Sequence, residues 1–252
     1  MSEHDTDNGR RDTLKAGLAL GGAIAAPSLI YTRNAWAANF SNDPGKAANV
    51  VLGFNVPLTG AYADEGADEL RAFKLAVKHL NGEGDGGMMK TFKPSALKGN
   101  GILGKKVAYV SGDDQTKADA ARASAKRMIE KDGVIMISGC SSSAVAVATQ
   151  SLAQEMGVIY MVGLSHSNDT TMKDRRRYGF RHFFNAYMSG QALAPILEKE
   201  FGKGRNAYHL TADYTWGWTQ EVTVTAATEK LGWKTVKAVR TPLGANDFSQ
   251  YL

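Results

Sequence analysis

The sequence predicts an α/β fold in which two doubly wound parallel-sheet lobes are joined by a hinge, with the second lobe truncated. From residue 49 onwards, short apolar runs alternate with amphipathic helical patterns that are long enough to connect parallel neighbours. The alternation pauses in the segment 165–178 and then resumes, which indicates a second lobe. The chain ends at Leu252, one turn into an expected helix that Asp247 would cap, and this ending predicts the truncation.

Residues 1–37 have the three-part plan of an export signal. The basic segment RRDTLK at 10–15 resembles a twin-arginine signal, a weakly apolar run follows at 16–26, and the small residues of AWA fit a cleavage site near Ala37. A membrane anchor is disfavoured, because the apolar run is rich in glycine and stops at Pro27, whereas a spanning helix needs roughly 20 apolar residues. We therefore expect twin-arginine export and a periplasmic mature protein.

The expected strands and helices follow the signal in order. The segment 68–80 shows the helical pattern, because its apolar residues Leu70, Phe73 and Val77 recur at helical spacing. Strands are expected at 49–54, 106–111, 134–138, 158–162, 180–185, 206–211 and 233–239. Helices are expected at 68–80, 116–131, 143–156, 189–201 and 219–231. The Gly- and Lys-rich segment 81–104 is interpreted as a surface insertion.

The lobes are expected to divide where the alternation restarts. Residues 38–185 are predicted to form a Rossmann-like N-terminal lobe, and residues 186–252 to form the start of an incomplete C-terminal lobe. The chain is expected to cross the hinge for the first time near 184–189, where a strand meets a Gly-containing turn.

The composition is that of an ordinary globular chain of 252 residues, of which 43% are hydrophobic and 22% charged. The net charge of +5 is too small to indicate nucleic-acid binding. The densest basic run, 173–177, lacks interleaved aromatic residues and is interpreted as a solvated loop. Cys140 is the only cysteine, so no intramolecular disulfide can form.

Catalytic and cofactor motifs are missing from the expected mature sequence. Its single cysteine and scattered histidines give no CxxC or HxxxH spacing, so we expect no metal site. No GxGxxG follows the strand at 49–54, and the glycine cluster at 17–22 lies in the signal, so we expect no dinucleotide cofactor. The sequence therefore predicts a protein that is not an enzyme.

Polar residues follow the expected strands, at the edge where open parallel sheets bind ligands. Ser141 and Ser142 lie directly before the helix at 143–156, where hydroxyl and backbone N–H groups can receive a carboxylate or carbonyl oxygen. Simple capping of that helix is the alternative. His166 follows the next strand, and for this residue a structural hydrogen bond is the alternative to ligand binding.

Four motifs carry a resemblance to a known family. They are PLTG at 57–60, AVKHLN at 76–81, GDD at 112–114 and GCSSS at 139–143. Together they resemble the type I periplasmic binding proteins of the Leu/Ile/Val-binding family of ABC transporters, over residues 50–252. The resemblance implies a monomer that captures a small polar solute and delivers it to an ABC transporter permease. Branched-chain amino acids, amides and urea-like compounds are the solutes that it implies.

In that family the serine cluster and the loop after the next strand grip the ligand carboxylate. Carried over to this chain, the resemblance implies ligand contacts from Ser141, Ser142, Leu164 and His166. The family commonly has a threonine at the position of His166, so recognition of a polar group other than a carboxylate is an alternative.

The resemblance implies two further contacts. The family places an aromatic residue near the ligand in the segment that corresponds to 62–66, where gapless matching puts Glu65. A carboxylate there indicates a ligand with donor or cationic groups, and a solvated loop acid is the alternative. Trp216, in the aromatic loop 213–218, corresponds to the place where the family sets an aromatic residue against the solute. Packing between the lobes is the alternative for these aromatic residues.

Two rival functions are left open by the sequence. A ligand-sensing receptor domain has the same fold, so transport and sensing are not separated. The resemblance of the signal to twin-arginine signals implies an exported enzyme as the second rival, which the missing metal and cofactor motifs disfavour.

Overall fold

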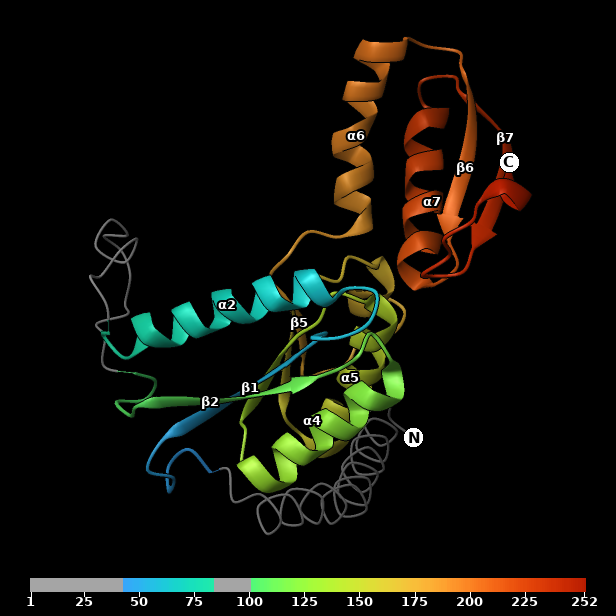
Figure 1. Cartoon of the computed structure of the whole chain (residues 1–252). Helices are drawn as coiled ribbons and strands as arrows, with labels where there is room; N and C mark the ends of the chain where they lie inside the picture. Colours follow the sequence, from blue (N-terminus) through green and yellow to red (C-terminus); the bar gives the residue numbers. More distant parts are fainter. Residues whose placement is uncertain (1–42, 84–100) are drawn as a thin grey trace, which may run out of the picture. The chain divides into compact units, whose positions relative to one another are not determined.

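The computed structural model describes residues 43–83 and 101–252, and residues 44–252 form one unit by their internal contacts (Figure 1). The twin-arginine segment, the cleavage site near Ala37 and most of the insertion expected at 81–104 lie outside the described residues. Within the described part, no helix is long and apolar enough to cross a bilayer.

Five parallel strands form the first sheet, in the order β2-β1-β3-β4-β5. Their bounds are β1 Val50–Val56, β2 Val107–Asp113, β3 Met136–Gly139, β4 Ile159–Val162 and β5 Gly179–Arg181. In β1, Phe54 is paired with Ser111 on one side and Ser138 on the other. The strand order changes direction between β1 and β3, so the loops that follow these two strands begin at a topological switch point.

Helices from the described residues cover both faces of this sheet. α2 (Ala63–Leu80) lies on one face, and α4 (Ala118–Asp132) and α5 (Ser143–Met156) lie together on the other (Figure 1). In the apolar core beneath α2, Phe54 stacks on Phe73 with ring centroids 4.5 Å apart. A parallel sheet with helices on both faces confirms the predicted doubly wound α/β architecture.

A second parallel sheet, of two strands, follows in the chain. Its strands are β6 (Asn206–Ala212) and β7 (Lys234–Thr241), and its helices are α6 (Ala186–Phe201) and α7 (Thr215–Glu229). α7 packs against the sheet, and α6 packs against α7. At Gly190 of α6 an added Cβ would lie 2.5 Å from Cγ2 of Thr223, so glycine there lets the two helices approach closely. The short helix η2 (Ser249–Tyr251) follows β7.

Several element boundaries differ from the predicted ones. α2 begins at Ala63 instead of residue 68, and α7 begins at Thr215 instead of residue 219. The first turn of each helix lies at the carboxyl end of the preceding strand. These turns lack the apolar spacing that marks the rest of each helix. Glu65 and Trp216, which were expected in loops, therefore lie in first helical turns. The strand expected at 180–185 is shorter, at Gly179–Arg181.

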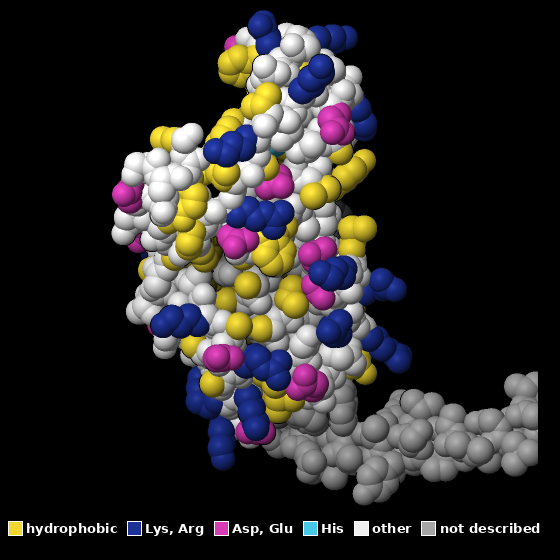
Figure 2. Space-filling model, turned by 90° about the vertical axis from the view of Figure 1, so that its right-hand side faces the viewer, with side chains coloured by type: hydrophobic (Ala, Val, Ile, Leu, Met, Phe, Trp, Pro, Cys, Tyr) yellow, Lys and Arg dark blue, Asp and Glu magenta, His cyan; other side chains and the backbone are white. Residues whose placement is uncertain are grey.

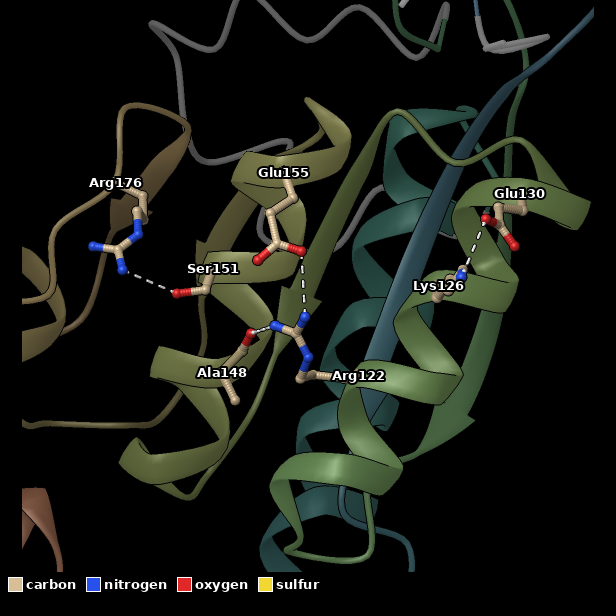
Figure 3. Close-up of polar contacts among 7 residues, drawn as sticks. All are labelled: Arg122, Lys126, Glu130, Ala148, Ser151, Glu155 and Arg176. Carbon is tan, nitrogen blue, oxygen red and sulfur yellow. Dashed lines mark hydrogen bonds and ion pairs between the residues drawn. The ribbon is translucent and has the colours of Figure 1, made fainter.

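Polar contacts on the outer surface join α4, α5 and the loop before β5 (Figure 3). Arg122 of α4 donates to the carbonyl oxygen of Ala148 at 3.1 Å and pairs with Glu155 at 3.3 Å. Arg176, from the basic run, donates to Oγ of Ser151 at 3.2 Å. Such solvent-accessible pairs contribute only about 0–1 kcal/mol each. On the face shown in Figure 2, basic and acidic side chains are interspersed and do not gather into a patch of one sign.

Candidate ligand-binding site

The PLTG turn after β1 is held by a carboxylate at the end of β2. Asp113 accepts hydrogen bonds from the backbone N–H groups of Leu58 (2.8 Å) and Thr59 (3.2 Å) and from the Thr59 hydroxyl (2.7 Å). Burial acts to raise the pKa of Asp113, but the hydrogen bonds from Thr59, Gln115 and Leu58 together lower it. The carboxylate therefore stays ionised, and the PLTG and GDD motifs stabilise each other.

The first turn of α2 packs closely against the PLTG turn. An added Cβ at Gly66 would lie 1.7 Å from the carbonyl oxygen of Pro57, so only glycine fits there without displacing the backbone. This approach places the start of α2 beside the carboxyl end of β1. Tyr62 and Glu65, from the start of the helix, face the cavity described below.

The serine segment, GCSSS at 139–143, connects β3 to α5. Ser142 is the N-cap residue of α5, but its side chain makes no capping hydrogen bond. Oγ of Ser143 accepts a hydrogen bond from the backbone N–H of Ser167 at 3.1 Å, which ties this segment to the loop after β4. Oγ of Ser141 is buried and has no partner among the residues that the structure describes. A buried hydroxyl of this kind costs free energy until a ligand or water pairs with it.

The loop after β4 presents His166 in a fixed orientation. Arg181 of β5 donates from its two terminal nitrogens to the carbonyl oxygens of Ser165 (2.7 Å) and Ser167 (2.6 Å), on either side of the histidine. The imidazole stacks on Phe184, with ring centroids 4.3 Å apart and an interplanar angle of 10°. Burial, and then the charge of Arg181, lower the pKa of His166, so the ring is neutral at pH 7. Its Nε2 is buried without a partner in the described residues.

Aromatic side chains reach the same region from the second sheet. Tyr214 is the N-cap residue of α7, and Trp216 lies in the first turn, with ring centroids 6.0 Å apart. Gly217 permits this placement, because an added Cβ would lie 2.0 Å from the carbonyl oxygen of Ala212 at the end of β6. The hydroxyl of Tyr214 lies 2.6 Å from the hydroxyl of Tyr62. This hydrogen bond joins the start of α7 to the start of α2.

A second group of hydrogen bonds joins α7 to the loop after β4. The hydroxyls of Ser167 and Thr215 are 2.8 Å apart, and the Thr215 hydroxyl also donates to the carboxylate of Asp169 at 2.9 Å. The side-chain amide of Asn168 donates to the Thr223 hydroxyl at 3.4 Å. These contacts hold the first turn of α7 next to the loop that carries His166.

The starts of α2 and α7, the serine segment and the loop after β4 line one cavity of about 190 Å³. Its lining residues are Tyr62, Glu65, Ser141, Leu164, His166, Tyr214 and Trp216. Five of the predicted site residues, Glu65, Ser141, Leu164, His166 and Trp216, thus lie around one space. Ser142 does not line it, because its side chain is buried at the start of α5. Tyr62 and Tyr214 were not among the predicted site residues, although both lie in the segments 62–66 and 213–218 from which Glu65 and Trp216 were predicted.

Two other cavities lie elsewhere on the described residues. One, of about 660 Å³, lies beside β2 and the last turns of α2, and its lining includes Lys74, Lys78 and Lys106. The other, of about 260 Å³, lies between β6 and α7. The smaller cavity of about 190 Å³ is the better candidate, because it is at the carboxyl ends of the strands, where open parallel sheets bind ligands. No group of three or more His, Cys, Asp or Glu side chains in the described part is arranged to hold a metal ion.

Two carboxyl groups that were not predicted to be buried, Glu69 and Asp114, lie in the interior of the protein. Glu69 of α2 is 7% exposed, and Asp114, after β2, is 1% exposed. Burial and the charge of Asp114 raise the pKa of Glu69 to about 8. Burial raises the pKa of Asp114 to about 7. An added Cβ at Gly163 would lie 1.7 Å from Oε1 of Glu69, so the carboxyl group fills the space beside the loop that carries Leu164.

The doubly wound parallel sheet, followed by a second parallel sheet, is the fold of the type I periplasmic binding proteins. The chain belongs to the periplasmic binding protein family, which residues 49–252 match. The resemblance inferred from the four sequence motifs is therefore confirmed.

The similar proteins are solute-binding proteins. Leu/Ile/Val-binding protein homolog 4 of Brucella abortus (strain 2308) is 26% identical over 247 residues, which cover 95% of this chain and 53% of the relative. A periplasmic binding protein from Burkholderia mallei superposes with a TM-score of 0.67 at 26% identity, over 81% of this chain and 49% of the other. A solute-binding protein of an ABC transporter from Rhodopseudomonas palustris BisB5, solved in complex with 3,4-dihydroxybenzoic acid, shares the fold, with a TM-score of 0.66 at 24% identity over 81% of this chain and 50% of the other. This chain spans about half the length of the relatives that it matches.

Proposed function

We propose that this protein is the substrate-binding component of an ABC transporter, which captures a small polar solute in the periplasm and delivers it to the permease. The observation that carries the proposal is the convergence of side chains from α2, the serine segment, the loop after β4 and α7 on one cavity. Membership of the periplasmic binding protein family and similarity to a Leu/Ile/Val-binding protein homologue support the same function.

The polar lining atoms provide the hydrogen bonds for the solute. Oγ of Ser141 and Nε2 of His166 are both buried without partners in the described residues, so a solute that pairs with them removes a desolvation penalty. Leu164 and Trp216 provide apolar contact area, and Glu65 receives donor groups of the solute. Ser142 acts indirectly, by starting the helix that follows Ser141.

Closure of two lobes on the solute is the mechanism that we propose for capture. The lobes are residues 38–185 and 186–252, and the first hinge crossing is near 184–189. The hydrogen bond between Tyr62 and Tyr214 and the one between Ser167 and Thr215 each join residues from both sides of this boundary. They are the type of contact that favours the closed arrangement when solute is bound.

Branched-chain amino acids, amides and urea-like compounds are the candidate solutes. The test is a titration of the protein with leucine, valine, acetamide and urea, followed by NMR of the backbone amides, which detects millimolar binding. We expect at least one solute to shift the amide signals of Ser141, Leu164 and Trp216 together. Ser141→Ala should weaken its binding about fivefold, because a net hydrogen bond contributes about 1 kcal/mol.

The matched control is Ser111→Ala, which removes the hydroxyl of an exposed serine on β2. It should leave the affinity unchanged. The proposal fails if no solute shifts the signals of the cavity residues, or if the two serine variants weaken binding equally.

A further inference from the structure

The cavity has an unbalanced charge. Of its seven lining residues, which all lie in the described part of the chain, none is Lys or Arg, and one, Glu65, is a carboxylate. The charge of Glu65 acts on the cavity wall, because after burial it contributes to the raised pKa of Tyr62. A ligand carboxylate would therefore meet a negative charge and no lining cation.

The charge of Arg181 acts on the lining, because after burial it lowers the pKa of His166, but its guanidinium is not available to a ligand. Arg181 does not line the cavity, and its two terminal nitrogens already donate to the backbone carbonyl oxygens on either side of His166. His166 itself is neutral at pH 7 and adds no positive charge to the lining. The polar lining thus consists of one anion and uncharged hydrogen-bonding groups.

Three aromatic rings form much of the remaining lining. Tyr62 comes from the start of α2, and Tyr214 and Trp216 come from the start of α7. The hydroxyls of the two tyrosines bond to each other at 2.6 Å, which restrains the orientation of both rings. The faces of such rings are electron-rich and attract organic cations. A carboxylate in the same lining adds its own charge to this attraction.

We propose that the cavity selects a small organic cation, with an ammonium or amidinium group between Glu65 and the aromatic rings of Tyr62, Tyr214 and Trp216. This inference rests on the proposed solute-binding function and specifies its ligand class. Ser141 and His166 pair with an uncharged polar part of the ligand where it has one. A carboxylate on the ligand is not required and lowers its affinity.

Four ligands that share a 3-methylbutyl chain separate the contributions of charge. Leucine has both an ammonium and a carboxylate, 3-methylbutylamine lacks the carboxylate, 4-methylpentanoate lacks the ammonium, and 3-methylbutan-1-ol is neutral. Each is titrated into the full chain at pH 7, with NMR of the backbone amides as the measurement. We expect 3-methylbutylamine to bind at least as tightly as leucine, and at least about tenfold more tightly than the alcohol or the acid.

Removal of the charge of Glu65 tests the site directly. Glu65→Gln should weaken the binding of 3-methylbutylamine about tenfold and that of 3-methylbutan-1-ol much less, because only the ammonium has a positive charge that the carboxylate attracts. The matched control is Glu200→Gln, at an exposed position of α6 outside the cavity, which should not affect either ligand.

The outcomes distinguish this inference from the proposed function. If 4-methylpentanoate or leucine binds in a Ser141-dependent way and 3-methylbutylamine does not, the cation preference is wrong and the solute-binding function stands. Equal affinities of the amine and the alcohol also overturn the inference. If none of the four ligands and none of the solutes named above shifts the cavity signals, both proposals fail.

Discussion

Replacement of Glu69 by glutamine should change how the stability of this protein depends on pH. The carboxyl group is buried against Gly163 and has no hydrogen-bond partner in the described residues. The backbone N–H of Leu164 lowers the pKa of Glu69 by less than burial raises it. This N–H group lies outside hydrogen-bonding geometry with the carboxyl group. The ionisable groups that interact with it, Asp114, Cys140 and Tyr160, are all acids, so none of them stabilises its charged form.

The direction of the effect follows from the raised pKa. Between the ordinary value of 4.5 and the folded-state value of about 8, Glu69 stays protonated in the folded protein and is ionised in the unfolded chain. The folded state therefore binds more protons in this window, and the free energy of unfolding falls as the pH rises through it. At about 1.4 kcal/mol per pKa unit, the loss is up to about 5 kcal/mol at high pH. Asp114, with a pKa of about 7, acts in the same direction.

Urea unfolding, followed by circular dichroism at pH 5, 6, 7 and 8, measures this loss. We expect the wild-type protein to lose stability steadily from pH 5 to pH 8, whereas Glu69→Gln should lose about 1.4 kcal/mol less per pH unit in the window where Glu69 titrates. His166, whose pKa is lowered, contributes with the opposite sign below pH 6.5, but equally in both proteins. The control is Glu155→Gln, at the solvent-accessible pair with Arg122, which should keep the wild-type slope. Identical slopes in wild type and Glu69→Gln would refute the reasoning.

Two further predictions concern the supports of the cavity. Gly66→Ala places a methyl group 1.7 Å from the backbone oxygen of Pro57. We therefore expect a loss of about 2–4 kcal/mol in the free energy of unfolding, measured with urea. An unchanged stability would show that α2 can move away from the PLTG turn at no cost. Arg181→Gln unpairs the carbonyl oxygens of Ser165 and Ser167. It should reduce the free energy of unfolding by about 2–4 kcal/mol and shift the NMR signals of the His166 ring. The control, Arg175→Gln at an exposed position, should do neither.

The regular part of the fold was predictable because local patterns decide it. The helix expected at 143–156 has those bounds in the structure, since a serine segment precedes it and Gly157 ends it in the left-handed conformation (φ 73°). The starts of α2 and α7 were missed because no apolar spacing marks them. They depend on the contacts of Gly66 and Gly217 with backbone oxygens at the ends of the preceding strands, and a helical pattern does not reveal such contacts.

The candidate site was likewise predictable only where the order of elements determines it. Rules about strand ends led to Ser141 and His166, because the carboxyl edge of a parallel sheet is defined by the order of elements. The pairing of Tyr62 with Tyr214 could not be predicted in this way, since it depends on how segments far apart in the chain meet. The burial of Glu69 was missed for a related reason: the space that it fills exists because Gly163, in a distant loop, has no side chain.

The hydrogen bond between the hydroxyls of Tyr62 and Tyr214 limits how many hydrogen-bond donors these two residues present to a bound molecule. Two phenols carry two hydroxyl hydrogens, and the contact between Tyr62 and Tyr214 uses one of them. A single hydroxyl hydrogen is left for any third partner, and either ring can supply it if the donor and acceptor exchange roles. The pair therefore works as one donor that can point in two directions. Replacement of either tyrosine by phenylalanine would fix the remaining hydroxyl on one side of the cavity and end this exchange.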